Sequence, residues 1–133
     1  MVTVWLAVND LNVPLDAVLY ASAIRAVVDP LVATTQAFIF LGNVPDLRAV
    51  PAYAGRDPDA LLARITTYNA ALASLADRHF GRVFIVDLFT ASADLMHGTT
   101  VSSDGFHPSA AGYRLIADRF AQSLRARGLA VAP

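Results

Sequence analysis

The sequence alternates short apolar segments with longer segments in which apolar residues recur every three or four positions. The short segments are rich in β-branched and aromatic residues, are typical of buried strands, and cover Val2–Val8, Ala37–Leu41 and Val83–Val86. The longer segments are typical of helices and cover residues 16–35, 57–80 and 109–127. A strand, a helix and a second strand in this order form a right-handed crossover between parallel strands. The order therefore predicts an α/β fold, with a parallel sheet covered by helices.

The predicted helices carry recognisable start and break signals. Asp57 and Pro58 place an N-cap acid before a proline at the first helical position, and Ser109 is expected to cap the last helix. Pro30 lacks an amide hydrogen and predicts a kink or a division in the first helix. The faces expected to be buried are Leu19, Ala23, Ala26 and Val27 in the first helix, Leu61, Ile65, Tyr68, Leu72 and Leu75 in the second, and Tyr113, Ile116, Phe120 and Leu124 in the third.

Composition narrows the class of protein. A chain of 133 residues without repeats or linkers predicts one domain, residues 1–133. The hydrophobic content of 56% suits strands that are buried on both faces, or apolar surface that is covered by something else. A net charge of −1 argues against a nucleic-acid partner, and the absence of cysteine excludes disulfides and thiolate chemistry. The longest wholly apolar strand-like run, Ala37–Leu41, is far shorter than the ~20 residues of a membrane helix, so we expect no membrane span.

The first ten residues, MVTVWLAVND, do not resemble a targeting segment. They lack the cationic start of a signal peptide and reach the polar Asn9 early, so we expect no signal peptide in this chain. On this basis the chain is cytoplasmic as it stands, and exported if a signal lies in a further N-terminal segment. The segment instead resembles a buried strand that starts at the first residue.

An acid and a histidine stand three residues apart in the loop SSDGFHPSAAGY, residues 102–113. Such a loop can fold back so that the carboxylate of Asp104 meets Nδ1 of His107, which leaves Nε2 free to take a proton from a nucleophile. Gly105 permits the tight backbone that this requires. The alternative is an ordinary turn with a surface histidine. The position of the loop after the third strand favours the catalytic interpretation, because chemistry in open α/β sheets gathers at the carboxyl ends of strands.

Asn9 is a second candidate, because it follows the first predicted strand and would lie on the same rim of the sheet. An amide side chain there can donate a hydrogen bond to a developing oxyanion. The alternative is that Asn9 and Asp10 merely start a turn. The three histidines have no metal-ligand spacing, so we expect neither a metal site nor a cofactor.

Together, the segments VTVWLAVND and DGFHPSAAGY resemble the SGNH, or GDSL-type, serine hydrolase family. The resemblance implies a three-layer α/β/α fold with a parallel, flavodoxin-like sheet. It also implies ester hydrolysis through a serine acyl-enzyme, with a small-molecule ester as substrate. By this resemblance Asn9 is the oxyanion donor, Asp104 the orienting acid and His107 the general base.

The chain also departs from the family pattern. The family carries its serine, in a G-D-S motif, and a glycine before the Asn block, whereas Asn9 stands almost at the N-terminus here. None of the seven serines, Ser22, Ser74, Ser92, Ser102, Ser103, Ser109 and Ser123, lies in a G-D-S context. We therefore expect an N-terminally incomplete domain that lacks the nucleophile, and a G-D-S motif in the same reading frame upstream of Met1. The alternatives are a non-catalytic module that binds a small molecule or a protein and self-associates through an exposed strand edge, and an enzyme that receives its serine segment from another chain.

Overall fold

The computed structural model describes residues 1–13 and 15–130, which pack as two compact units. Unit 1 contains Met1–Val44 and Ala63–Ile85, and unit 2 contains Pro45–Leu62 with the described residues from Val86 onward. The helix α3 (Pro58–Arg78) begins in unit 2 and continues into unit 1.

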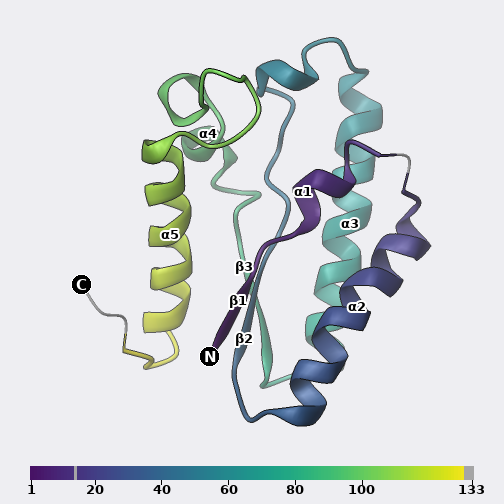
Figure 1. Ribbon diagram of the computed structural model, residues 1–133, viewed down its shortest axis with the longest axis vertical. Coiled ribbons are helices and arrows are strands. Elements are labelled where there is room, and N and C mark those ends of the chain that lie inside the picture. The colour runs from purple at the N-terminus through teal and green to yellow at the C-terminus, as the bar shows by residue number, and fades with distance from the viewer. Residues whose placement is uncertain (14, 131–133) are drawn as a thin grey trace. The chain divides into compact units, whose positions relative to one another are not determined.

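The sheet has the strand order β1-β2-β3, from β1 (Val2–Val4), β2 (Ile39–Gly42) and β3 (Val83–Val86), and Figure 1 shows the strands side by side. Strands β1 and β2 pair in parallel, with Val2 opposite Ile39. All four residues of β2 are buried, as expected of the middle strand. The predicted α/β fold with a parallel sheet is confirmed, and β3 has the predicted bounds.

The predicted first strand is wrong beyond Val4. Ala7–Asp10 forms the short helix α1 instead of continuing the strand. Asn and Asp are poor strand residues, and Arg64 of α3 donates hydrogen bonds to the carbonyls of Asp10 and Leu11, which favours the helical turn. Asn9 therefore lies in a helix, and four residues separate it from the end of β1.

The helix α2 (Ala17–Thr34) begins where predicted, because the Asp16 side chain accepts hydrogen bonds from two amides of its first turn. It continues through Pro30, so the helix is not divided there, and the kink given as the other outcome stays a prediction. The predicted buried face is also wrong. Tyr20, Ile24 and Val28 are buried, whereas Leu19 is 56% exposed and the other residues of the predicted face are exposed.

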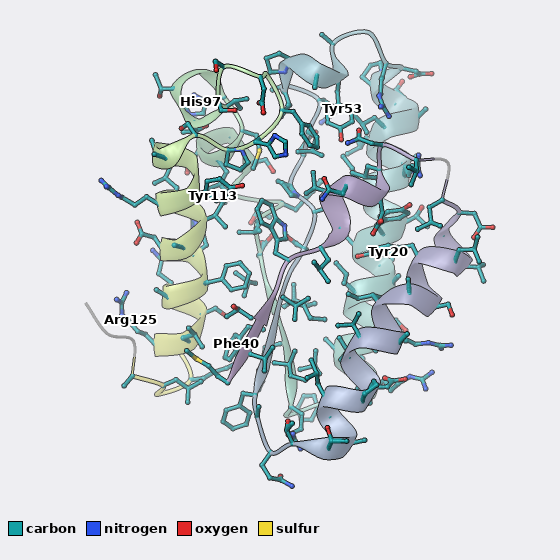
Figure 2. The ribbon with its side chains drawn as sticks, viewed as in Figure 1. Tyr20, Phe40, Tyr53, His97, Tyr113 and Arg125 are labelled. Atoms are coloured by element: carbon teal, nitrogen blue, oxygen red, sulfur yellow. The ribbon has the colours of Figure 1, made fainter. Side chains whose placement is uncertain are left out.

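A stack of two aromatic rings fixes this orientation of α2. The rings of Tyr20 and Tyr68 lie 3.9 Å apart and parallel, so that α2 packs against α3 (Figures 1 and 2). The predicted face of α3 is confirmed, with all five residues buried. Within the described residues, α2 is the one helix long and apolar enough to cross a membrane by length and composition. A core helix passes the same test, and the absence of a membrane span stays a prediction.

Unit 2 contains the short helices η1 (Pro51–Tyr53), α4 (Ser92–Leu95) and η2 (Gly98–Thr100), followed by α5 (Ala110–Arg125). Ser109 caps α5 as predicted, because its hydroxyl accepts a hydrogen bond from the Gly112 amide. Ile116 and Leu124 are buried as predicted, whereas Phe120 is half-buried and Tyr113 is 52% exposed. The close approach of Gly112 to another segment, described below, turns Tyr113 toward solvent.

Candidate active site

The Asp-x-x-His segment of unit 2 is a closed loop between η2 and α5. A turn begins it, in which the Gly105 amide donates to the Ser102 carbonyl at 3.0 Å. The Ser102 amide donates to the His107 carbonyl at 2.8 Å, and Val101 and Pro108 form an antiparallel bridge. The two ends of the loop are therefore tied together by backbone contacts.

Asp104 and His107 contact each other within this loop. Oδ2 of Asp104 lies 2.6 Å from Nδ1 of His107. An ionised carboxylate accepts hydrogen bonds and cannot donate them, so the contact places a proton on Nδ1. In the neutral ring the lone pair is then on Nε2, which has no hydrogen-bond partner within the described part of the chain. The side chains of His107 and Asp104 are 58% and 50% exposed, so Nε2 belongs to a solvent-accessible imidazole.

The second oxygen of Asp104, Oδ1, accepts three hydrogen bonds. They come from the Ser102 hydroxyl at 2.6 Å, the Phe106 amide at 2.9 Å and the His107 amide at 3.0 Å. The Ser102 hydrogen bond, followed by that of His107 and the two amides, holds the pKa of the Asp104 carboxyl well below its usual value. Asp104 is therefore ionised at any pH at which it could orient a histidine.

A second segment of unit 2 supports the loop from outside. The Ala52 amide in η1 donates to the Gly105 carbonyl at 2.9 Å. Gly105 has a φ of +72°, and a Cβ there would lie 3.2 Å from Cβ of Pro51, so a side chain meets both strain and crowding. The Phe106 ring contacts the rings of Tyr53 and His107, with centroids 6.0 Å and 4.7 Å away, and Figure 2 labels Tyr53.

The N-terminus of α5 closes the loop on its other side. The Ser109 amide donates to the Thr100 carbonyl at 2.8 Å, and its hydroxyl donates to the Thr99 carbonyl at 2.7 Å. Gly112 packs so closely on this segment that a Cβ would lie 2.2 Å from the Thr100 oxygen. The loop that carries the dyad is thus anchored to η1, η2 and α5.

Asn9, the third predicted site residue, lies in α1 of unit 1 and is exposed. Arg64 surrounds the end of α1 with hydrogen bonds to the carbonyls of Asp10, Leu11, Val13 and Leu15. The Tyr68 hydroxyl donates to the Leu15 carbonyl at 2.9 Å. These contacts fix the segment that follows Asn9. Its role as an oxyanion donor stays a prediction, as do the catalytic roles of Asp104 and His107.

No serine hydroxyl hydrogen-bonds to His107 within residues 1–13 and 15–130. The hydroxyls of Ser92, Ser102 and Ser109 donate to Phe89, Asp104 and Thr99 respectively. Ser22 and Ser74 lie within helices, as does Ser123, which accepts from Arg127. Ser103 is exposed and its side chain makes no hydrogen bond to the described residues.

Sequence reasoning missed two contributors to these sites. It treated Ser102 only as a possible nucleophile, although its hydroxyl holds the Asp104 carboxylate. It did not single out Arg64, because contacts between a side chain and carbonyls some fifty residues away leave no local pattern. The spacing of Ser102 two residues before an aspartate was a readable signal, since such residues commonly bond within turns.

Unit 2 also contains a cavity of about 570 Å³, within the range of small-molecule pockets. Apolar residues that include Ala93 and Met96 form most of its lining, with the ion pair of Asp46 and Arg48 and the exposed His97 among the polar groups (Figure 2 labels His97). Hydrogen bonds from Arg48 lower the pKa of the Asp46 carboxyl. Among the described residues, no three His, Asp or Glu side chains gather to hold a metal ion.

Comparison with solved structures shows that the fold is shared with a hydrolase. The chain superposes with a TM-score of 0.69 on the crystal structure of LAE5, an alpha/beta hydrolase enzyme from the metagenome of Lake Arreo, Spain. The two share 21% sequence identity, and the match covers 98% of this chain but 60% of the LAE5 chain. None of the curated proteins matches the sequence.

The family model of the GDSL-like Lipase/Acylhydrolase family matches residues 1–115, which include Asn9, Asp104 and His107. The match extends over most of the 133 residues. The chain belongs to the GDSL-like lipase/acylhydrolase family.

Proposed function

We propose that unit 2 carries the proton-transferring dyad of a serine ester hydrolase, with His107 as general base and then general acid, and Asp104 as its orienting acid. One observation carries the proposal. In a chain of this family, Nδ1 of His107 lies 2.6 Å from an ionised carboxylate, and its Nε2 has no partner among the described residues. A histidine in this state can accept a proton at Nε2.

The steps follow from these protonation states. Nε2 of His107 takes the proton of a serine hydroxyl while the serine oxygen attacks the ester carbonyl, and Asp104 stabilises the imidazolium that results. The carbonyl oxygen becomes an oxyanion that accepts a hydrogen bond from the Asn9 amide. The alcohol then leaves with the proton from Nε2, and water, activated by the same histidine, hydrolyses the acyl-enzyme. The apolar lining of the cavity in unit 2 suits the hydrocarbon part of a small ester.

The proposal places the nucleophile outside the seven serines of this chain. The 133-residue chain should then hydrolyse p-nitrophenyl acetate no faster than its His107→Ala variant, because the base has no hydroxyl to activate. A rate that depends on His107 would contradict this assignment. A fluorophosphonate that labelled one of the seven serines would identify the residue responsible.

The positive test needs a polypeptide in which a G-D-S segment precedes Met1 in the same reading frame. Such a polypeptide should hydrolyse the ester, and His107→Ala should lower kcat/KM by about 10⁴-fold or more. Asn9→Ala should lower it by about 10²–10³-fold, the usual effect of losing one oxyanion donor.

His79→Ala is the matched control, because His79 is also paired with an aspartate, Asp29, at 2.7 Å. It should leave kcat/KM within about threefold of the parent once the protein is folded. Equal losses in the His79 and His107 variants would reject the assignment of His107.

A second candidate function is a binding module that self-associates, and the edge of the sheet favours it. The Val2 amide donates to the Phe38 carbonyl of the segment leading into β2, so the amide and carbonyl of Thr3 point away from β2. Among the described strands, β1 has a neighbour on one side only. Unpaired strand edges of this kind pair with other chains, and a second copy of the chain supplies the same edge.

Thr3→Pro tests this function, because it removes the outward amide hydrogen and spares the hydrogen bonds to β2. Light scattering should show a dimer for the parent chain and for the Thr3→Val control, and a monomer for Thr3→Pro. A monomeric parent chain would reject self-association through β1.

A further inference from the structure

Ser102 makes three contacts within residues 101–109, the loop between η2 and α5 that is called the dyad loop below. Its amide donates to the His107 carbonyl at 2.8 Å, and its carbonyl accepts from the Gly105 amide at 3.0 Å. Its hydroxyl donates to Oδ1 of Asp104 at 2.6 Å. The first two contacts belong to the backbone and persist with any side chain at this position, so the third is the specific contribution of a hydroxyl.

The two oxygens of Asp104 have different partners. Oδ1 accepts from Ser102 and from two amides, whereas Oδ2 faces Nδ1 of His107. We propose that Ser102 is a positioning residue, whose hydroxyl fixes the Asp104 carboxylate so that His107 keeps its proton on Nδ1 and its lone pair on Nε2. The inference rests on the proposed function, because a serine hydrolase needs that arrangement of the imidazole to activate its nucleophile.

The exposure of the dyad makes this positioning necessary. With half of the Asp104 side chain exposed, water competes for both carboxylate oxygens. The two amides reach Oδ1 from the turn that follows Asp104, whereas the Ser102 hydroxyl reaches it from the segment before. Contacts from both sides oppose rotation of the carboxylate, and rotation would take Oδ2 away from Nδ1. Without that acceptor the proton can move to Nε2, which then cannot accept a proton from a nucleophile.

The test compares variants at Ser102 that differ by one hydroxyl. Ser102→Thr keeps the hydroxyl, and Ser102→Val has the shape of that threonine with a methyl group in place of the hydroxyl. Ser103→Ala is the matched control, since the neighbouring Ser103 is exposed and its hydroxyl bonds to no described residue. The protein used is the 133-residue chain labelled with ¹⁵N, with its His107 signals assigned from a His107→Gln variant.

The readout is the imidazole ¹⁵N spectrum of His107 at pH 9, which reports the ratio of Nδ1-protonated to Nε2-protonated ring directly. The parent chain, Ser102→Thr and Ser103→Ala should all show a proton mainly on Nδ1. Ser102→Val should lower the ratio by about threefold or more, the lower end of the net contribution of one hydrogen bond. Loss of a purely structural side chain would change stability and leave this ratio unchanged.

The outcomes separate the two proposals. If Ser102→Val keeps the parent ratio, the inference about Ser102 is overturned and the proposed function stands. If the parent chain itself carries its proton mainly on Nε2, the dyad does not form in solution and the proposed function fails. Ser102→Ala is a second variant without the hydroxyl, and it should give the same ratio as Ser102→Val. If both of these variants fail to fold while Ser102→Thr folds, the hydroxyl determines the fold of the loop, and the positioning role is rejected.

Discussion

Substituting Gly112 by alanine should destabilise the protein, although the same change stabilises most helices. Gly112 lies in the first turn of α5, where replacing glycine by alanine ordinarily gains about 0.5–1 kcal/mol of unfolding free energy. Here the new Cβ would lie 2.2 Å from the Thr100 carbonyl oxygen. The contact is with backbone, so it cannot be relieved by turning a side chain.

The size of the loss in unfolding free energy follows from the contacts that must separate to relieve this overlap. Relief of the overlap separates α5 from residues 99–100 and weakens two hydrogen bonds of Ser109, each of which contributes about 0.5–1.5 kcal/mol. Residual crowding costs about 1–3 kcal/mol. After subtraction of the gain in helix propensity, the net loss is about 1–5 kcal/mol.

Urea unfolding followed by circular dichroism measures this loss. The matched control is Ala111→Gly, an exposed neighbour in the same helix turn, which should lose about 0.5–1 kcal/mol through helix propensity alone. The single tryptophan, Trp5, lies in unit 1, and its fluorescence shows whether that unit unfolds together with unit 2. A Gly112→Ala variant as stable as the parent chain, or more stable, would refute the reasoning.

Three further predictions concern other described contacts. Asn69→Leu should lower the unfolding free energy by about 2–5 kcal/mol in urea titrations, because the Asn69 amide pairs with both the N–H and the C=O of the fully buried Val44. A loss below about 1 kcal/mol would mean that these groups find other partners. Asp104→Asn should destabilise the chain more at pH 6 than at pH 3, with most of the change with pH appearing only below pH 3. Folding lowers the pKa of the Asp104 carboxyl, so the carboxylate stabilises the folded chain fully above the ordinary pKa of about 3.9. This stabilisation is lost progressively as the pH falls toward the pKa of the folded state. Equal shifts of the urea midpoint at both pH values would contradict this linkage. Tyr20→Phe should raise the unfolding free energy by about 1 kcal/mol in thermal or urea unfolding. The Tyr20 hydroxyl is buried without a hydrogen-bond partner among the described residues, and burial raises its pKa; a destabilised variant would show that it is bonded in solution.

The orientation of α2 shows why parts of the fold could not be read from the sequence. The helix is apolar around most of its circumference, and charge is confined to Arg25 and Asp29. Spacing then predicts two adjacent faces almost equally well, and the residues predicted to be buried are the exposed ones. The stack of Tyr20 on Tyr68, a tertiary contact 48 positions apart in the sequence, decides between the faces. In α3, polar residues mark the exposed face, and its buried face was predicted correctly.

The candidate site likewise has one part that the sequence predicts and one part that depends on distant contacts. The contact between Asp104 and His107 joins residues three apart, so the pattern with Gly105 between them was sufficient to predict it. The environment of Asn9 depends on Arg64, some fifty residues away, and the predicted strand end there was wrong. Asn9 and the dyad belong to different compact units, so joining them in one mechanism rests on the resemblance to the family and on the proposal.

The short sequence separation of the hydrogen bonds in the dyad loop affects how the loop folds and how it can be engineered. The hydrogen bonds within it, between Ser102, Asp104, Gly105, Phe106 and His107, span two to five residues. Short closures cost little chain entropy and form early, so the loop should assemble soon after η2 and α5 come together. Because these contacts lie within one short segment, the geometry of the Asp104–His107 pair should be retained when that segment is moved to a related protein. A segment of about sixteen residues, from His97 to Gly112, contains both side chains of the dyad and the groups that hydrogen-bond to the Asp104 carboxylate. We expect it to keep the dyad geometry when it is exchanged between family members together with its contact to Ala52.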